Sequence, residues 1–280
     1  MNSKYEIRFA SHPADVKTYD TQRLRKEFLV ENIFLPNRIT WVYSDYDRYM
    51  VGGIFPTSQA LQLETIEPLK AKYFLERREI GIINIGGEAK VTINGEIVKL
   101  GYKEALYIGQ GNESVVFDSV SYQKPAKLYV NSAPAHTTYP CKKITLAEAD
   151  AMEAGAPETS NKRRINRLVI NSIVPSCQLQ MGMTEFAAGS VWNTMPPHTH
   201  SRRMEAYFYF EIPEKQALCH FMGETNETRH IWVNNEQAVI SPSWSIHSGV
   251  GTAQYAFIWG MAGENLDYGD MDVCQPCDLR

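Results

Sequence analysis

The sequence predicts an all-β protein with two tandem β-barrel domains behind a short N-terminal helical arm. Two observations support this fold class. Between residues 70 and 135, short runs of β-branched and aromatic residues alternate with turn residues, at a spacing typical of a sandwich or barrel. The second half of the chain then repeats segments of the first half in the same order, as expected for two domains of one plan.

Bulk composition excludes several classes of function. The chain has 280 residues, of which 44% are hydrophobic and 21% charged, with a net charge of −4. This balance offers no basic field for nucleic acid, and no apolar run is long enough to span a membrane. The N-terminus has no apolar signal-peptide core, and five scattered cysteines are typical of reduced thiols. We therefore expect a cytoplasmic protein that binds neither nucleic acid nor membrane.

The N-terminal arm is expected to span residues 1–50. Apolar residues recur at helical spacing over Asp20–Val30, and Asp20 or Thr21 can cap that helix. The first barrel is expected to follow over residues 51–140. Its strongest local signal is Asn94-Gly95, which predicts a β-hairpin between two strand-like runs.

Residues 141–165 change in character and are interpreted as a linker. Thr145–Gly155 could form one short helical turn, and a loop-like stretch follows it. The basic cluster Lys162-Arg163-Arg164 is interpreted as a solvated linker face. The second barrel is then expected to span residues 166–280.

Two matches indicate the internal repeat. Arg77-Arg78 precedes strands of the first barrel as Arg202-Arg203 precedes strands of the second. The segment Lys99–Leu106 also matches Trp232–Val239. The two halves are therefore expected to share one topology.

The second half contains a pattern of possible metal ligands. His198 and His200 stand two apart, so a strand would present both imidazoles on one face. Glu205 follows after a short bend, and His247 comes later, after a proline turn. Three imidazoles and one carboxylate suit a divalent transition ion and leave coordination positions open for a substrate.

The repeat breaks down at these four positions. The matches place Tyr73, Leu75, Ile80 and Ser114 where the second half has its possible ligands. Such residues form no good donor set, so we expect one metal ion per chain. Glu79, one position from Ile80, is interpreted as a possible displaced remnant of the glutamate.

The His-x-His-x4-Glu stretch followed by a distant histidine resembles the cupin metal motif, with Trp244 where that motif usually has a glycine. Longer strings are similar to the bacterial 4-deoxy-L-threo-5-hexosulose-uronate ketol-isomerases of pectin breakdown. This resemblance runs from the N-terminal helix to Arg280. It is carried by Phe74–Glu79, Ile83–Gly87, Ala133–Pro140 and Glu236–Gly249.

This resemblance implies a bicupin, a tandem pair of double-stranded β-helix barrels. It implies one Zn²⁺ per chain on His198, His200, Glu205 and His247, and a homohexamer in a cytosolic uronate pathway. The implied substrate is a small keto-uronate, 5-dehydro-4-deoxy-D-glucuronate, and the implied product is 3-deoxy-D-glycero-2,5-hexodiulosonate.

Several roles stay open at the level of sequence. The catalytic base is a hydroxide on the ion, Glu205, Tyr207 or Tyr209. Arg202 or Arg203 is a candidate for holding the substrate carboxylate.

Other noticeable residues are interpreted as structural. These residues are His220, His230 and His136, for which capping of a partner subunit's site is the alternative; the pair Cys274 and Cys277 resembles half a zinc ribbon or a redox pair and is interpreted as incidental. Trp192, Trp244 and Trp259 are expected to fill cores or to wall the pocket.

Two other classes of function fit the same residues. A cupin dioxygenase would use the same ligand set with redox-active iron. A non-catalytic sugar-binding bicupin would need no open coordination position. Metal analysis and oxygen consumption would separate the dioxygenase from an isomerase.

Overall fold

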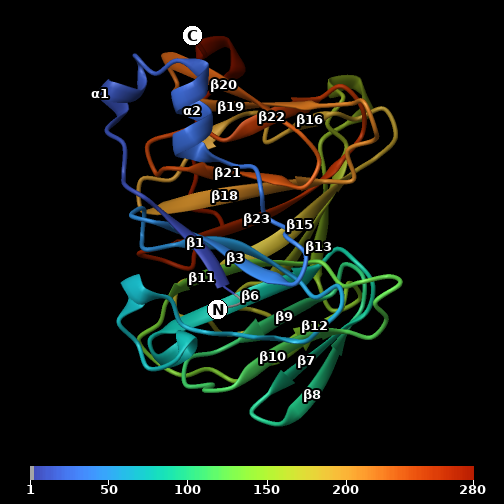
Figure 1. Ribbon diagram of the computed structural model, residues 1–280. Coiled ribbons are helices and arrows are strands. Elements are labelled where there is room, and N and C mark those ends of the chain that lie inside the picture. Colours follow the sequence, from blue (N-terminus) through green and yellow to red (C-terminus); the bar gives the residue numbers. More distant parts are fainter. Residues whose placement is uncertain (1–2) are drawn as a thin grey trace. The chain divides into compact units, whose positions relative to one another are not determined.

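The computed structural model describes residues 3–280, which cluster into two compact units (Figure 1). Unit 1 comprises the residues up to Arg8, Asn32–Ala149 and Leu168–Met181. Unit 2 comprises Phe9–Glu31, Asp150–Arg167 and Gly182–Arg280. Strands dominate both units, which confirms the predicted all-β class.

Unit 1 contains one seven-stranded and one four-stranded sheet. The seven strands lie in the order β1 (Ser3–Arg8), β3 (Arg38–Ser44), β4 (Met50–Phe55), β11 (Leu128–Pro134), β6 (Arg78–Asn84), β9 (Ala105–Ile108) and β12 (Lys142–Ile144). The four strands lie in the order β5 (Leu61–Gln62), β10 (Val115–Ser119), β7 (Ala89–Ile93) and β8 (Glu96–Leu100). Apolar side chains from both sheets, including Ile80 and Ile82 on one face of β6, form one buried core.

The predicted hairpin around Asn94-Gly95 is confirmed. Strands β7 and β8 pair antiparallel, with Ile93 opposite Glu96. Asn94 and Gly95 have φ angles of 47° and 94°, as the two central residues of a type I′ turn require. These residues tolerate the left-handed backbone region better than others do, so the local sequence determines the turn.

The second seven-stranded sheet, most of which belongs to unit 2, carries the strands that position the candidate site. Its order is β13 (Asp150–Ala154), β14 (Arg163–Val169), β15 (Gln180–Phe186), β23 (Ala256–Gly263), β18 (Arg203–Phe210), β21 (Gln237–Ser241) and β2 (Leu29–Val30). A four-stranded sheet has the order β16 (Trp192–Asn193), β22 (Ser248–Gly251), β19 (Leu218–Glu224) and β20 (Glu227–Val233). A short third sheet pairs β17 (His198–Thr199) with β24 (Asp272–Val273).

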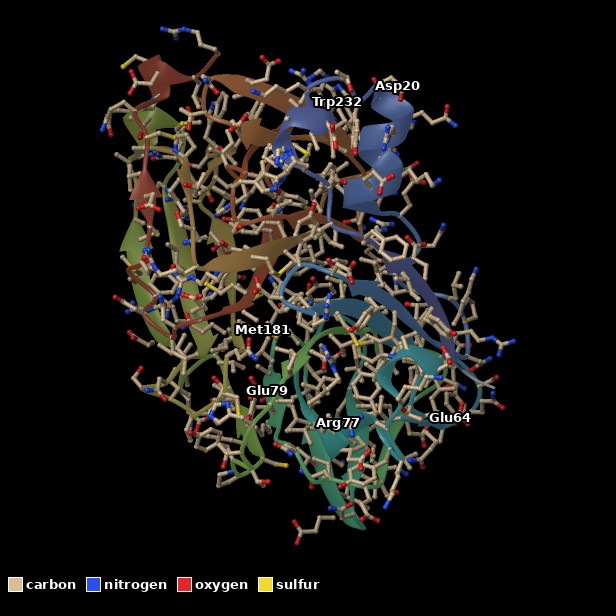
Figure 2. All side chains as sticks on the ribbon, turned by 90° about the vertical axis from the view of Figure 1, so that its left-hand side faces the viewer. Asp20, Glu64, Arg77, Glu79, Met181 and Trp232 are labelled. Atoms are coloured by element: carbon tan, nitrogen blue, oxygen red, sulfur yellow. The ribbon has the colours of Figure 1, made fainter. Side chains whose placement is uncertain are left out.

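The predicted N-terminal helix is α2 (Thr21–Phe28), and Asp20 caps it by accepting a hydrogen bond from the Arg23 amide (Figure 2). Leu24 and Phe28 are buried four residues apart on one face of this helix. The other helical segments are short: α1 (Pro13–Val16) and the 3₁₀ turns η1 (Glu67–Leu69), η2 (Phe74–Glu76), η3 (Pro157–Thr159) and η4 (Pro276–Asp278). No helix within residues 3–280 is both long and apolar enough to cross a bilayer.

Within Thr145–Gly155 the chain makes one hydrogen-bonded turn, in which the Glu148 amide donates to the Thr145 carbonyl at 3.1 Å, but no helix. Asp150–Ala154 forms β13, which pairs antiparallel with β14. Hydrogen bonding to a neighbouring strand outweighs the helix propensity of this short alanine- and glutamate-rich segment. Two strands, β12 and β13, therefore lie within the residues predicted as a linker. We retain the division into an arm, two barrels and a linker as a proposal.

The strand register confirms that the two halves share one plan. In unit 1, Ile83 of β6 lies opposite Ala105 of β9. In unit 2, Phe208 of β18 lies opposite Ala238 of β21. The first sequence match equates Ile83 with Phe208, and the second match equates Ala105 with Ala238. Corresponding positions in the two units can therefore be compared residue by residue.

Candidate metal centre

The four predicted ligands come from three places in unit 2. His198 lies on β17, and His200 follows directly in the bend toward β18. Glu205 is the third residue of β18, and His247 immediately precedes β22. Their ligand atoms all lie within 4.8 Å of one another, a grouping that could hold a metal ion.

The distances within this cluster fit a shared ion. The Nε2 atom of His198 lies 3.1 Å from that of His200 and 3.0 Å from that of His247. Glu205 Oε2 lies 3.0 Å from His200 Nε2 and 2.9 Å from His247 Nε2. Ligand bonds of roughly 2.0–2.2 Å place neighbouring donor atoms about 3 Å apart. The donor set and its spacing thus fit a divalent transition ion.

The surroundings keep at least two of the four groups in the form that binds a cation. Burial, together with the neighbouring His247 and His200, lowers the pKa of His198 to about 2, so its imidazole is neutral at physiological pH. Burial alone would raise the pKa of Glu205, but its contacts with His247 and His200 outweigh burial and lower it. The glutamate is therefore ionised.

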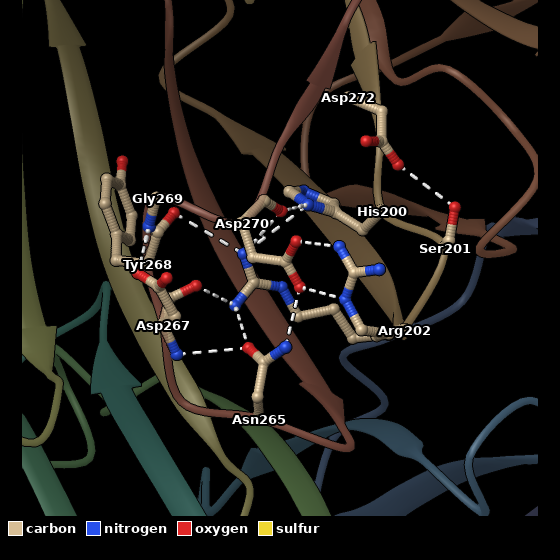
Figure 3. Close-up of polar contacts among 10 residues, drawn as sticks. His200, Ser201, Arg202, Asn265, Asp267, Tyr268, Gly269, Asp270 and Asp272 are labelled. Atoms are coloured by element: carbon tan, nitrogen blue, oxygen red, sulfur yellow. Dashed lines mark hydrogen bonds and ion pairs between the residues drawn. The ribbon is translucent and has the colours of Figure 1, made fainter.

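The C-terminal segment orients one of these histidines (Figure 3). His200 Nδ1 donates to the carbonyl oxygen of Asp270 at 2.6 Å, which leaves Nε2 to face the cluster. The guanidinium of Arg203 is buried, and it donates to the carbonyls of Asp267, Tyr268 and Asp270. Arg203 thereby holds the backbone that orients His200.

The same segment is also held from outside. The exposed guanidinium of Arg202 pairs with both carboxylate oxygens of Asp270 and holds the pKa of that carboxyl below its usual range. Ser201 donates to Asp272, and His198 on β17 pairs with Val273 on β24. Arg202 and Arg203 are thus engaged with the C-terminal segment, and neither lines the cavity at the cluster. The expectation that one of them holds a substrate is not supported.

A cavity of about 280 Å³ adjoins the cluster, large enough for a small acid. Its walls include Arg163, Thr194, Tyr207, Trp259 and Tyr268. The interpretation of Arg163 as part of a solvated linker face is wrong, because this side chain faces the cavity. Strand alternation could have found it, since Arg163 and Ile165 share one face of β14 while Arg164 lies on the other.

The two tyrosines of β18 have different surroundings. The Tyr207 hydroxyl shares a 2.8 Å hydrogen bond with Thr194 and lines the cavity. Burial, and then the charge of Glu205, raise the pKa of Tyr207 well above 10. Tyr209 instead shares a 2.7 Å hydrogen bond with buried His220, outside the cavity lining. Tyr207 therefore stays protonated, and Tyr209 is too remote to act as a base.

The remaining candidates lie outside the described cavity. His136 and His230 are exposed, and His220 is buried against Tyr209. Cys274 contacts the carbonyl of Pro197, and Cys277 is exposed; both are free thiols. Among the three tryptophans only Trp259 lines the cavity.

Glu79 lies in unit 1 and is buried (Figure 2). Its carboxylate accepts hydrogen bonds from the amides of Cys177, Gln178 and Leu179, each at 2.8 Å. It also accepts one from the Tyr107 hydroxyl at 2.7 Å. Four donors satisfy this buried carboxylate, so it anchors the segment 177–179 and does not act as a metal ligand here.

A seven-stranded and a four-stranded sheet in each unit, together with the three-histidine and one-glutamate cluster, define a tandem cupin protein with a candidate metal centre. Solved structures support this fold. An IolB-like protein from Salmonella typhimurium LT2 superposes with a TM-score of 0.65 at 15% identity, covering 81% of this chain and 87% of that chain. Oxalate decarboxylase from Bacillus subtilis superposes with a TM-score of 0.55 at 11% identity, covering 80% and 71%.

The sequence comparison is more specific. Residues 37–273 match the KduI/IolB family, and the chain belongs to that family. A relative from Formosa agariphila, named 4-deoxy-L-threo-5-hexosulose-uronate ketol-isomerase, is 60% identical over 280 residues, which is the full length of both chains.

Proposed function

We propose that this chain is a metal-dependent ketol-isomerase of uronate breakdown. It converts 4-deoxy-L-threo-5-hexosulose uronate, also named 5-dehydro-4-deoxy-D-glucuronate, to 3-deoxy-D-glycero-2,5-hexodiulosonate. The observation that carries the proposal is the full-length 60% identity to a relative named for this reaction. The buried cluster of three histidines and a glutamate beside a small cavity supplies a place for the chemistry.

The reaction moves a carbonyl group from C1 to C2 without net oxidation. A proton leaves C2, its bonding electrons form a C1–C2 double bond, and the C1 oxygen takes up a proton. The C2 hydroxyl then loses its proton as the carbonyl forms there, and a proton is delivered to C1. One base that can return the proton to the neighbouring carbon suffices.

We propose that His198, His200, Glu205 and His247 hold one Zn²⁺ ion per chain. The ligand atoms of three imidazoles and one ionised carboxylate lie within 4.8 Å of one another, which supports this assignment. When bound, the ion would supply Lewis-acid stabilisation of the negative charge that develops on the substrate oxygens.

The side chains around the cavity divide the remaining work. Tyr207 stays protonated, so its hydroxyl can donate a hydrogen bond to the substrate oxygen on which negative charge develops. Among the described residues that line the cavity, Glu205 is the one carboxylate. Of the groups that the chain itself supplies, this leaves Glu205 to take the proton from C2 and return it to C1.

An anaerobic assay tests the proposal. Purified protein is given the keto-uronate without oxygen or reductant, and ketose product is measured before chelation, after chelation and after zinc is restored. We expect turnover, loss and recovery in that order. In heavy water, deuterium should enter the carbon that was C1 of the substrate when the base exchanges with solvent. Turnover that requires oxygen or ferrous iron would refute the isomerase and favour the dioxygenase.

We further propose that the enzyme is a cytoplasmic homohexamer. The ketol-isomerase resemblance supports the hexamer, and the five free cysteines suit a reducing compartment. Light scattering of the purified protein measures its mass, and a stable monomer at micromolar concentration would contradict the assembly.

A further inference from the structure

The proposed substrate carries its negative charge at the end opposite the reacting carbons. The carbonyl that moves is at C1 and C2, whereas the carboxylate is C6. A carboxylate that enters a partly buried cavity loses water contacts and needs a cationic partner with matching geometry. The ligand cluster cannot provide one at the far end of the substrate, because its own side chains contribute a carboxylate and imidazoles.

One cation lines this cavity. Of the lysines and arginines in residues 3–280, Arg163 alone contributes to the cavity wall. Arg202 is paired with Asp270, and Arg203 is engaged with three backbone carbonyls. Arg167, further along β14, pairs with Asp150 at 2.8 Å.

The Arg163 side chain is only partly committed within the described part of the chain. Its Nη1 donates to the carbonyl of Asn161 at 2.9 Å, and no carboxylate lies within ion-pair distance of it. Tyr207, Tyr268 and Tyr255 lie around the guanidinium, and burial lowers its pKa despite these neighbours. A half-buried guanidinium without an acidic partner retains donors for a bidentate anion.

Its position on the strand is also specific. Arg163 and Ile165 lie on the face of β14 that lines the cavity. Tyr207 and Tyr268, from other segments, line the same cavity. The next residue, Arg164, lies on the opposite face, where its guanidinium comes within 3.9 Å of Glu153. The chain thus offers two adjacent arginines of which only one faces the cavity.

We propose that Arg163 binds the C6 carboxylate of the keto-uronate and so orients its C1–C2 end toward the cluster of His198, His200, Glu205 and His247. This inference rests on the proposed function. It assigns to Arg163 the selection of acids over neutral sugars of the same length. It also explains why a cavity with mostly apolar walls contains an arginine.

The test compares Arg163→Gln with its matched control Arg164→Gln. Each variant and the wild type are assayed with the keto-uronate and with its analogue in which C6 is a neutral hydroxymethyl group. Arg163→Gln should raise the KM for the uronate about 10- to 100-fold while kcat changes little, because a contact made in both ground and transition states is lost. For the neutral analogue, Arg163→Gln and wild type should behave alike. Arg164→Gln should resemble the wild type with both compounds.

A second readout does not require turnover. The uronate reduced at C1 is inert as a substrate, and its binding can be measured by calorimetry. Arg163→Gln should weaken this binding by the same factor as it raises KM, with metal content and melting temperature unchanged. Arg163→Lys retains the charge but not the planar guanidinium. Its affinity for the reduced uronate should lie between those of the wild type and Arg163→Gln.

The possible failures are distinguishable. Suppose that the wild type turns over the uronate. If Arg163→Gln then has the same kinetic constants as the wild type, or if its activity falls equally with both compounds, the role of Arg163 is refuted and the isomerase stands. If wild type turns over neither compound, the proposed function fails and this inference fails with it.

Discussion

The two units place different side chains at corresponding positions of one strand plan. Unit 2 has His198, His200, Glu205 and His247 where unit 1 has Tyr73, Leu75, Ile80 and Ser114. Leu75 and Ile80 are at most 1% exposed and belong to the hydrophobic core of unit 1. The same backbone positions therefore serve as a polar centre in one unit and as packed core in the other. The fold allows a metal site at this place but does not require it.

Glu79 shows that a carboxylate must lie on the correct face of the strand to join such a cluster. It lies one residue before Ile80, the position that corresponds to Glu205. A shift of one residue along a strand moves a side chain to the opposite face. Glu79 accordingly meets the amides of residues 177–179 and does not face the core. A carboxylate near the right position thus becomes a structural anchor when the strand face is wrong.

The largest expected effect is the loss of a cluster histidine. His247→Ala should lose the bound metal and reduce turnover by at least about 10³-fold, because the ion supplies most of the charge stabilisation in such reactions. Elemental analysis and the anaerobic assay measure the two losses. The exposed His230 provides the control, and His230→Ala should keep both metal and activity. Retained metal in His247→Ala would exclude this histidine as a ligand.

A glutamate at Ile80, the position of unit 1 that corresponds to Glu205, tests whether unit 1 could also hold a metal ion. Ile80→Glu should destabilise the protein by roughly 3–5 kcal/mol, since it buries a carboxylate without partners. Ile97→Glu is the control, because Ile97 is 62% exposed in the same unit and should cost at most about 0.5 kcal/mol. Denaturant unfolding measures both. A stable Ile80→Glu protein with a second bound metal would show that unit 1 retains a latent site.

The anchor role of Glu79 predicts a smaller loss. Glu79→Gln keeps the size of the side chain but removes its charge and turns one acceptor into a donor that faces amides. We expect a loss of about 2–3 kcal/mol in unfolding free energy with unchanged metal content. The exposed Glu88 is the control, and Glu88→Gln should have little effect. Loss of metal in Glu79→Gln at full stability would contradict a purely structural role.

The smallest predicted effect concerns the two arginines that hold the C-terminal segment. Arg203→Met should weaken metal binding about 10- to 100-fold, because the Asp270 carbonyl would no longer be held against His200. Arg202→Met removes only an exposed ion pair and should change the affinity little. Competition with a chelator of known affinity measures both. Equal effects of the two changes would argue against orientation of His200 through Arg203.

The four cluster residues could be predicted from the sequence because their spacing and the internal repeat both mark them. His198 and His200 stand two apart, and the repeat isolates all four positions as exceptions to a shared plan. The anchoring of His200 could not be predicted, because Asp270 is 70 residues away and contributes a backbone carbonyl that any residue possesses. Arg163 was missed because residues 141–165 were interpreted as a linker, which concealed the strand pair β13–β14 that directs Arg163 into the cavity.

We propose that one of the two barrels holds the metal centre and that the other does not. Elemental analysis of purified wild-type protein, after removal of loosely bound ions, tests it most directly. The account predicts one equivalent of metal per chain, together with isomerase activity that rises in proportion to that content. Two tightly bound equivalents per chain, or full activity with none, would contradict it.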